Sequence, residues 1–251
     1  MRLVVLTQNI FGAAPGWRMR RDRIARRIAR LRPDIIGLQE VHARDTLGTD
    51  SQAHELASLV GDYHVDFAPA RVTPGGECEG VALLCGHGIR ERSVESLTLD
   101  ATDRLDRSSP RVVLCAMLEV AGVAVDVFVT HLSLSRRARV RTMRELVAFA
   151  ARERERSGSV GAVLIGDLNA VPGERAIAAL EAGDRAGAWV DAWAQAHGRA
   201  RGGTWPSFAP LRRIDYVFYQ PRELWRLEAC GREPLSGSDH LGIVARLSLA
   251  S

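Results

Sequence analysis

Acidic, amide and imidazole side chains stand at or near the ends of several apolar segments of this sequence. The positions are Asn9, Glu40, His131, Asp167, Asn169, Asp215, Asp239 and His240. In α/β proteins, residues at strand ends converge on one cleft while the strands fix their positions. Together such groups can bind a divalent cation, orient a water molecule and transfer protons, which is the chemistry of a hydrolase.

Two of these motifs suggest a cation and an activated water. Glu40 ends an apolar segment and offers the hard oxygen ligand that Mg²⁺ prefers, although a lone glutamate there could equally cap a strand in solvent. Asp167 and Asn169 stand two residues apart after the glycine at position 166. Such a carboxylate and amide can orient an attacking water and donate hydrogen bonds to a phosphate oxygen.

The histidines are weaker signals when each is taken alone. His131 closes a long apolar segment, where a histidine is more often a satisfied core residue than a catalyst. Asp239 and His240 are adjacent near the C-terminus, so one can face a metal and the other a substrate. Asp215 could hold the His240 imidazole in one tautomer, as a carboxylate does in other hydrolytic sites.

Short apolar segments and a few arginine-rich helices must position these groups. Strands are predicted at residues 2–10, 34–41, 79–86, 111–120, 123–131, 160–166, 213–219 and 241–249. Several are apolar almost throughout, which is typical of strands covered on both faces. Helices are predicted at 17–32, 136–156 and 174–182, and a surface loop at 198–212. We interpret the arginines of 17–32 as a solvated helix face rather than a phosphate-binding patch.

The composition is that of a globular protein, with 46% hydrophobic and 25% charged residues in 251. No repeat or linker divides the chain, so we expect one domain over residues 1–251 and a monomer. No apolar run approaches the roughly 20 residues that span a bilayer, and no signal peptide precedes the first strand, so we expect a cytoplasmic protein without a membrane segment. All 34 basic residues are arginine against 30 acidic ones, an excess too small to identify the substrate.

The four cysteines lack the close pairing of a zinc or redox site. Cys85 and Cys115 end apolar runs, where a free thiol behaves as a small buried hydrophobe. A disulfide between Cys78 and Cys85 is possible from the sequence, but a cytoplasmic location argues against it. We therefore assign the cysteines no chemistry.

Taken in order, the motifs carry a family resemblance. The series Asn, Gln-Glu, Thr-His, Gly-Asp-x-Asn, Ile-Asp-Tyr and Ser-Asp-His-x-Gly, running from residue 9 to residue 242, resembles the endonuclease/exonuclease/phosphatase superfamily. The resemblance implies a four-layered α/β/β/α sandwich in which two mixed β-sheets pack face to face with helices outside. It also implies hydrolysis of a phosphate ester with Mg²⁺, or Mn²⁺, as cofactor.

The same resemblance implies roles for individual residues. Glu40 is similar to the principal metal ligand, and Asn9 and Asp239 to residues close to the metal or its waters. Asp167 matches the residue that orients or deprotonates water, and Asn169 the one that binds a phosphate oxygen. His240, paired with Asp215, matches the histidine that stabilises the scissile phosphate. His131 matches a second histidine that assists the leaving oxygen, although the sequence does not assign the proton transfers among these groups.

The substrate is less defined. Arg111 stands where some members of the superfamily place a phosphate-facing arginine, with an ordinary surface arginine as the alternative. Trp205 and Phe208 could rim the substrate pocket or pin their loop to the core. Phe11 replaces an acidic residue that is common in DNA-repair members. We therefore favour a small or accessible phosphodiester or phosphomonoester, with a nuclease acting on DNA or RNA and a catalytically silent binding module as alternatives.

Overall fold

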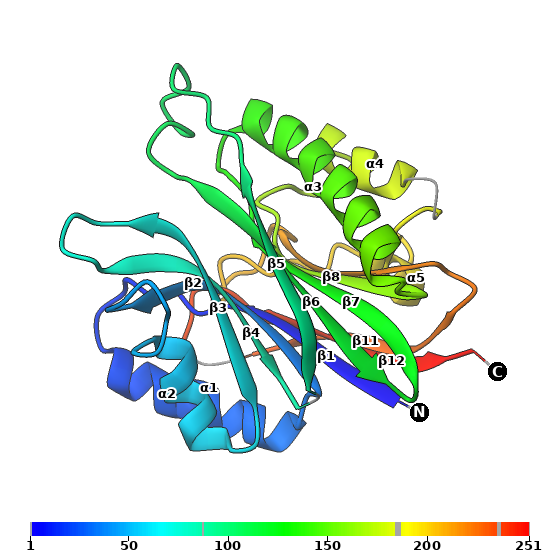
Figure 1. The fold of residues 1–251 in the computed structure, drawn as a ribbon, viewed down its shortest axis with the longest axis horizontal. Coiled ribbons are helices and arrows are strands. Elements are labelled where there is room, and N and C mark those ends of the chain that lie inside the picture. Colours follow the sequence, from blue (N-terminus) through cyan, green and yellow to red (C-terminus); the bar gives the residue numbers. More distant parts are fainter. Residues whose placement is uncertain (1, 87, 184–186, 235–236, 251) are drawn as a thin grey trace.

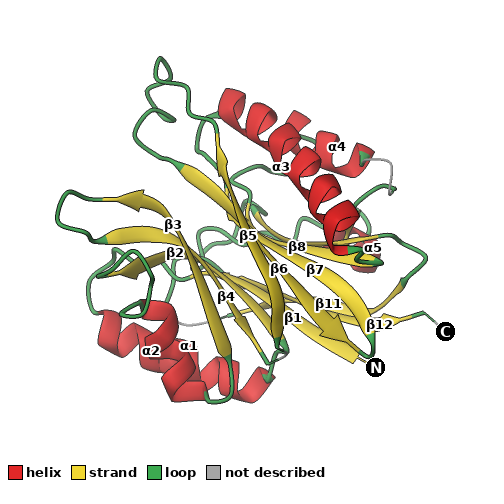
Figure 2. Ribbon diagram, viewed as in Figure 1, coloured by secondary structure: helices red, strands yellow, loops and turns green. Residues whose placement is uncertain are grey.

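Two six-stranded β-sheets form the centre of the computed structural model, which describes residues 2–86, 88–183, 187–234 and 237–250. The first sheet has the strand order β11-β12-β1-β2-β4-β3 and the second β5-β6-β7-β8-β10-β9. Figure 1 shows α1 and α2 on the outer side of the first sheet and α3 and α4 on the outer side of the second. The helices and strands therefore make the predicted α/β/β/α sandwich (Figure 2).

The first sheet consists of β1 (Arg2–Asn9), β2 (Ile35–Ala43), β3 (His64–Val72), β4 (Cys78–Cys85), β11 (Trp225–Glu233) and β12 (Gly242–Leu249). The second consists of β5 (Ile89–Leu97), β6 (Arg111–Val120), β7 (Val123–His131), β8 (Gly161–Asp167), β9 (Val190–Asp191) and β10 (Asp215–Gln220). The helices are α1 (Trp17–Leu31), α2 (Gln52–Val60), α3 (Arg136–Ser157), α4 (Arg175–Ala182) and α5 (Ala192–His197).

Each sheet contains one parallel pair, β1 with β2 and β7 with β8, among antiparallel neighbours. The carboxyl ends of the parallel strands carry polar residues. In each sheet an antiparallel neighbour, β12 beside β1 and β10 beside β8, begins where the parallel strands end. β12 follows Asp239 and His240, and β10 begins at Asp215. Strand direction alone therefore brings the candidate residues of each sheet to one edge.

Three buried clusters account for the four layers. One lies between the sheets and is built largely from aliphatic side chains of both. Phe128, Phe149 and Trp189 belong to a second, which joins the other face of the second sheet to α3 and α4. Ile24 and Ile28 belong to a third, under α1 and α2. The central strands are covered on both faces, as their apolar sequences predict.

A glycine in β2 allows the two sheets to pack closely at this point. A Cβ added at Gly37 would lie 2.5 Å from Cδ1 of Ile165 in β8. The two parallel pairs thus face each other across the central layer, and their ends are held at a fixed separation.

Several elements lie outside the predicted set. The sequence does not predict β3, β5 and β11, which are edge strands with several exposed side chains, some of them charged. α2 and the short elements β9 and α5 also lack a strong apolar pattern. The four cysteines are buried and form no disulfide within the described part of the chain. No helix among the described residues is long and apolar enough to span a bilayer.

Candidate active site

The polar residues at the two parallel pairs meet across the gap between the sheets. Asn9 and Glu40 come from β1 and β2, whereas His131 and Asp167 end β7 and β8. His131 and Asp167 are register partners, and Asp167 is also the partner of Asp215 on β10. The second sheet therefore presents three functional side chains in one row.

Asn9 joins the two halves of the site. Its side chain is fully buried, and its Nδ2 donates to Oε1 of Glu40 at 3.0 Å and to Oδ2 of Asp167 at 3.1 Å. Its Oδ1 accepts a hydrogen bond from the backbone N–H of Phe11 at 2.9 Å. One amide thus holds a carboxylate from each sheet and reduces their mutual repulsion.

Glu40 reaches the site because β2 is irregular. The pairing of β2 with β4 shifts register between Leu38 and Val41, and Glu40 has a φ of 57°. A bulge of this kind re-aims one side chain and places a non-glycine residue in the left-handed region, which is uncommon away from functional sites.

Asp167 and Asn169 form a tight turn at the end of β8. Oδ1 of Asp167 accepts the backbone N–H of Asn169 at 2.9 Å, and Nδ2 of Asn169 donates to the Leu132 carbonyl oxygen at 2.9 Å. The same Nδ2 lies 3.1 Å from Nε2 of His131. Gly166 permits this turn, because a Cβ there would lie 2.1 Å from the carbonyl oxygen of Thr130.

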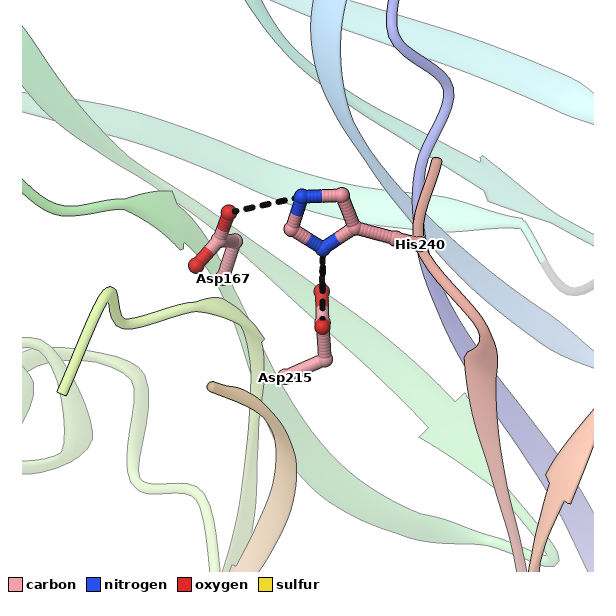
Figure 3. Close-up of side chains that lie close together, drawn as sticks. All are labelled: Asp167, Asp215 and His240. Carbon is pink, nitrogen blue, oxygen red and sulfur yellow. Dashed lines mark hydrogen bonds and ion pairs between the residues drawn. The ribbon is translucent and has the colours of Figure 1, made fainter. Parts of the chain in front are cut away.

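His240 and Asp215 form a buried pair (Figure 3). Nδ1 of His240 lies 2.9 and 3.2 Å from the two Asp215 carboxylate oxygens. Nε2 points toward Asp167, with Oδ2 at 3.8 Å (Figure 3). Asp215 thus fixes the imidazole and leaves Nε2 directed at the other groups of the site.

The two histidines are driven toward opposite charge states. Burial alone would lower the pKa of His240, but the charge and hydrogen bond of Asp215, with the charges of Asp167 and Asp239, raise it. Burial, reinforced by the charges of Arg111 and His240, holds the pKa of His131 well below its usual range. Near neutral pH, His240 is therefore an imidazolium and His131 a neutral imidazole.

Burial and the charge of Asp215 raise the pKa of the Asp167 carboxyl. The charge of His240 and hydrogen bonds from Asn169 and Asn9 act in the opposite direction. A carboxylate with a raised pKa is a stronger base than one in water, and Asp167 faces a neutral histidine on one side and a cationic one on the other.

A cavity of about 210 Å³ opens over these groups. The predicted site residues that line it are Glu40, Arg111, His131, Asp167, Asn169, Asp239 and His240. Asn9 and Asp215, each fully buried, lie behind this wall and contact the lining residues. Leu134, Trp205 and Arg212 complete the rim together with Phe11 and Ile214.

Arg111 is a cation that no described residue contacts by a hydrogen bond or a close ion pair, and its Nε is buried and unpaired. It lines both the 210 Å³ cavity and a smaller one of about 50 Å³ on the side of β3 and β4. Buried charges in proteins are normally paired, so this guanidinium is suited to an anionic ligand.

Glu40 and Asp239 are the residues best suited to hold a divalent cation. Both line the cavity, and Oδ1 of Asp239 is buried without a hydrogen-bond partner, whereas Oδ2 accepts from Nε1 of Trp205 at 3.1 Å. Burial raises the pKa of Glu40, a cost that a bound cation would offset. Hard oxygen donors of this kind suit Mg²⁺.

A second acidic group is less suited to a metal. Ligand atoms of Asp167, Asp215 and His240 all lie within 4.8 Å of one another. Both Asp215 oxygens, however, already face the His240 ring nitrogen. The three side chains are better described as a hydrogen-bonded acid–base unit.

Arg20 was missed at the sequence level. It donates to the carbonyl oxygens of Ile10 and Ala14, each at 2.8 Å, to Pro15 at 3.1 Å and to Gly237 at 2.9 Å. It therefore clamps the segment after Asn9 to the segment before Asp239. The interpretation of the α1 arginines as a solvated face was wrong for Arg20. The sequence of an arginine-rich helix does not show which arginine side chain contacts the rest of the protein.

The two aromatic candidates of the 198–212 loop differ in their surroundings. Trp205 lines the cavity and also binds Asp239, so both suggested roles apply to it. Phe208 is 87% exposed, so it neither lines the cavity nor pins its loop to the core. The loop base is tied to the site by hydrogen bonds from Ser207 to the backbone oxygens of Ser238 and Asp239.

Comparisons with known proteins agree on the architecture. The model of the Endonuclease/Exonuclease/phosphatase family matches residues 6–240. An endonuclease/exonuclease/phosphatase from Beutenbergia cavernae superposes with a TM-score of 0.78 at 26% identity, over 100% of this chain and 72% of that one. A search of curated proteins gave no match.

Two further solved structures share the fold. A mannosyl-6-phosphatase from Bacteroides thetaiotaomicron has a TM-score of 0.77 at 21% identity, over 99% of this chain and 100% of that one. The human Nocturnin catalytic domain has a TM-score of 0.76 at 20% identity, over 99% of this chain and 94% of that one. At these identities the likeness concerns the fold alone.

The clamp at Arg20 yields a stability prediction. Arg20→Gln should lower the free energy of unfolding by about 2 kcal/mol or more, because a hydrogen bond from a charged donor contributes about 1.5–3 kcal/mol and water replaces only part of the four that are lost at this partly buried position. Urea denaturation measures this change. Arg26→Gln, at an exposed position on the same helix, should stay within about 0.5 kcal/mol of the unmodified protein. Equal effects of the two substitutions would contradict the clamp.

Proposed function

Because the chain belongs to the endonuclease/exonuclease/phosphatase family, we propose that it is a divalent-metal-dependent hydrolase of phosphate esters. The observation that carries this proposal is one cavity that combines two carboxylates suited to a cation, Glu40 and Asp239, with two cationic groups, Arg111 and His240. A phosphate ester requires both kinds of group, since its oxygens bind metal and hydrogen-bond donors while water attacks phosphorus.

Glu40 and Asp239 would hold the metal, Mg²⁺ or Mn²⁺. When bound, the metal supplies Lewis-acid stabilisation of the charge on the phosphate oxygens. Asn9 is better placed to orient Glu40 than to reach the cavity itself, because its Nδ2 donates to that carboxylate and its Oδ1 is occupied by Phe11. Trp205 has the equivalent role for Asp239.

Asp167 would position and deprotonate the attacking water. Its carboxylate is held at both oxygens, by the backbone of Asn169 and by Asn9, so its direction is fixed before substrate binds. A proton accepted from water is most favourable for a carboxyl whose pKa is raised, as it is here. The displacement is then direct attack by water, with P–O cleavage and no covalent intermediate.

The remaining groups would contact the phosphate. His240, kept cationic by Asp215, directs Nε2 toward the reacting centre, and its charge counts most as negative charge develops on the phosphate oxygens. Arg111 supplies a second cation. Asn169 would donate to a phosphate oxygen by exchanging one of the two contacts of its Nδ2, to the Leu132 carbonyl oxygen or to His131. His131, neutral and adjacent to Asp167, is assigned to the leaving oxygen.

This assignment argues against a catalytically silent binding module, because every side chain that it uses lines or supports one cavity. We also propose that residues 1–251 act as one catalytic domain, since both sheets contribute to the same site.

Asp167→Asn and His240→Ala should each lower the rate of bis-p-nitrophenyl phosphate hydrolysis by roughly a hundredfold or more, because one removes the base and the other a preorganised cation. Steady-state kinetics measure the loss. Asp126→Asn is the control, because Asp126 is a buried aspartate near the start of β7 that accepts hydrogen bonds from Ser157 and Ser159, and it should keep its activity. Near-normal turnover by a site variant would refute the role of that residue.

Glu40→Gln should weaken metal binding while preserving the side-chain shape and an acceptor for Asn9. We expect the Mg²⁺ concentration for half-maximal activity to rise roughly tenfold or more, since one charged ligand is lost. Calorimetric titration with Mn²⁺ gives a second readout that does not depend on turnover. Glu119→Gln, at an exposed position, is the control. Identical metal titrations for the two variants would remove Glu40 from the metal site.

A further inference from the structure

An arginine-lined groove lies beside the cavity, where α3 and α4 begin. Its lining residues are Arg136, Arg137, Val140, Glu174 and Arg175, and its volume is about 490 Å³. None of these residues belongs to the site described above. We refer to it as the arginine groove.

The acidic residues in and near the groove are already engaged. Glu174, the one carboxylate among the lining residues, is bound by the buried Arg139 at 2.8 Å and approached by Arg136 at 3.5 Å. In the adjoining loop, Asp103 binds Ser135 and Asp106 binds Arg141. The local carboxylates therefore leave other arginine charge uncompensated.

Arg137 and Arg175 carry that excess charge. Neither forms an ion pair within the described part of the chain. Neither helix has an acidic residue in its first turn, and Glu174, the N-cap of α4, is already bound by Arg139 and Arg136. The exposed guanidinium groups of Arg137 and Arg175 are therefore available to an anion, and their planar geometry suits phosphate in particular.

The groove and the cavity are lined by residues that lie close together in the sequence. Leu134 lines the cavity and Arg136, two residues later, lines the groove. Two residues span at most about 7 Å between their Cα atoms, so the two linings lie within reach of one extended ligand. In the loop between β8 and α4, Asn169 likewise lines the cavity and Glu174 the groove.

We propose that the arginine groove binds phosphate groups of the substrate other than the one that is cleaved. The inference rests on the proposed function and narrows it to substrates that carry several phosphates. Arg137 and Arg175 contact the flanking phosphates, and Val140 supplies an apolar surface beneath them. The shared chemistry is a series of phosphates, in a nucleic-acid strand or in a compact polyphosphate.

The test is direct binding in EDTA, where the proposed hydrolysis cannot occur. The probes are a fluorescein-labelled thymidine octanucleotide, followed by anisotropy across a salt series, and inorganic tripolyphosphate, followed by calorimetry. The variant is Arg137→Gln/Arg175→Gln. The control, Arg222→Gln/Arg226→Gln, removes the same charge from exposed arginines that follow β10, at the end of that strand opposite Asp215.

The groove variant should lose roughly tenfold in affinity for at least one probe, and the control should not. For the octanucleotide, the slope of log K against log salt should fall by about 1.4, because each phosphate contact to a single strand contributes about 0.7. A loss of affinity for the octanucleotide alone identifies the ligand as a nucleic-acid strand, and a loss of affinity for tripolyphosphate identifies it as a compact polyphosphate. Equal behaviour of the two double variants with both probes would overturn the proposal.

Hydrolysis of bis-p-nitrophenyl phosphate, which has a single phosphate, separates this inference from the proposed function. The groove variant should hydrolyse it with unchanged kcat and KM. A protein that binds the probes through the groove but hydrolyses nothing would contradict the function and leave the groove intact. Normal hydrolysis without groove-specific binding of either probe would contradict the groove and leave the proposed function intact.

Discussion

The site depends on the buried amide of Asn9, which donates hydrogen bonds to a carboxylate from each sheet. Glu40 and Asp167 belong to separate sheets, and the packing of Gly37 against Ile165 fixes how far apart those sheets lie. Two carboxylates in a low-dielectric region repel each other strongly unless donors or cations lie between them. The central apolar layer therefore supports the site electrostatically as well as sterically.

Around Asn9, burial and neighbouring charges give side chains of the same type different properties. The two histidines end in opposite charge states because carboxylates raise the pKa of His240 against the effect of burial, whereas burial, reinforced by the charge of Arg111, lowers the pKa of His131. The carboxylates also differ, since Asp215 is hydrogen-bonded to His240 while Oδ1 of Asp239 accepts no hydrogen bond from the described residues and lies 4.0 Å from Nε2 of His240. The cavity thus presents cationic donors and free oxygen ligands together, the combination on which the proposed phosphoesterase rests.

The sequence predicts the central strands and the polar residues at their ends, because doubly covered strands are apolar throughout and polar groups interrupt them visibly. Edge strands such as β5 and β11 are not predicted, since half of their side chains face solvent and resemble a loop or helix surface. Arg20 and the contact between Trp205 and Asp239 depend on which loops meet in space. Likewise, the arginine groove forms only when the starts of α3 and α4 come together.

The most direct measurement is hydrolysis of bis-p-nitrophenyl phosphate, p-nitrophenyl phosphate and plasmid DNA by the unmodified protein, each with Mg²⁺, Mn²⁺ or EDTA. The account predicts turnover of at least one substrate with a divalent metal and its loss in EDTA, because Glu40 and Asp239 supply oxygen ligands but no Lewis acid of their own. The preferred substrate would distinguish diester, monoester and nucleic-acid hydrolysis. Turnover that persists in EDTA, or none with any metal, would contradict the proposed metal-dependent phosphoesterase.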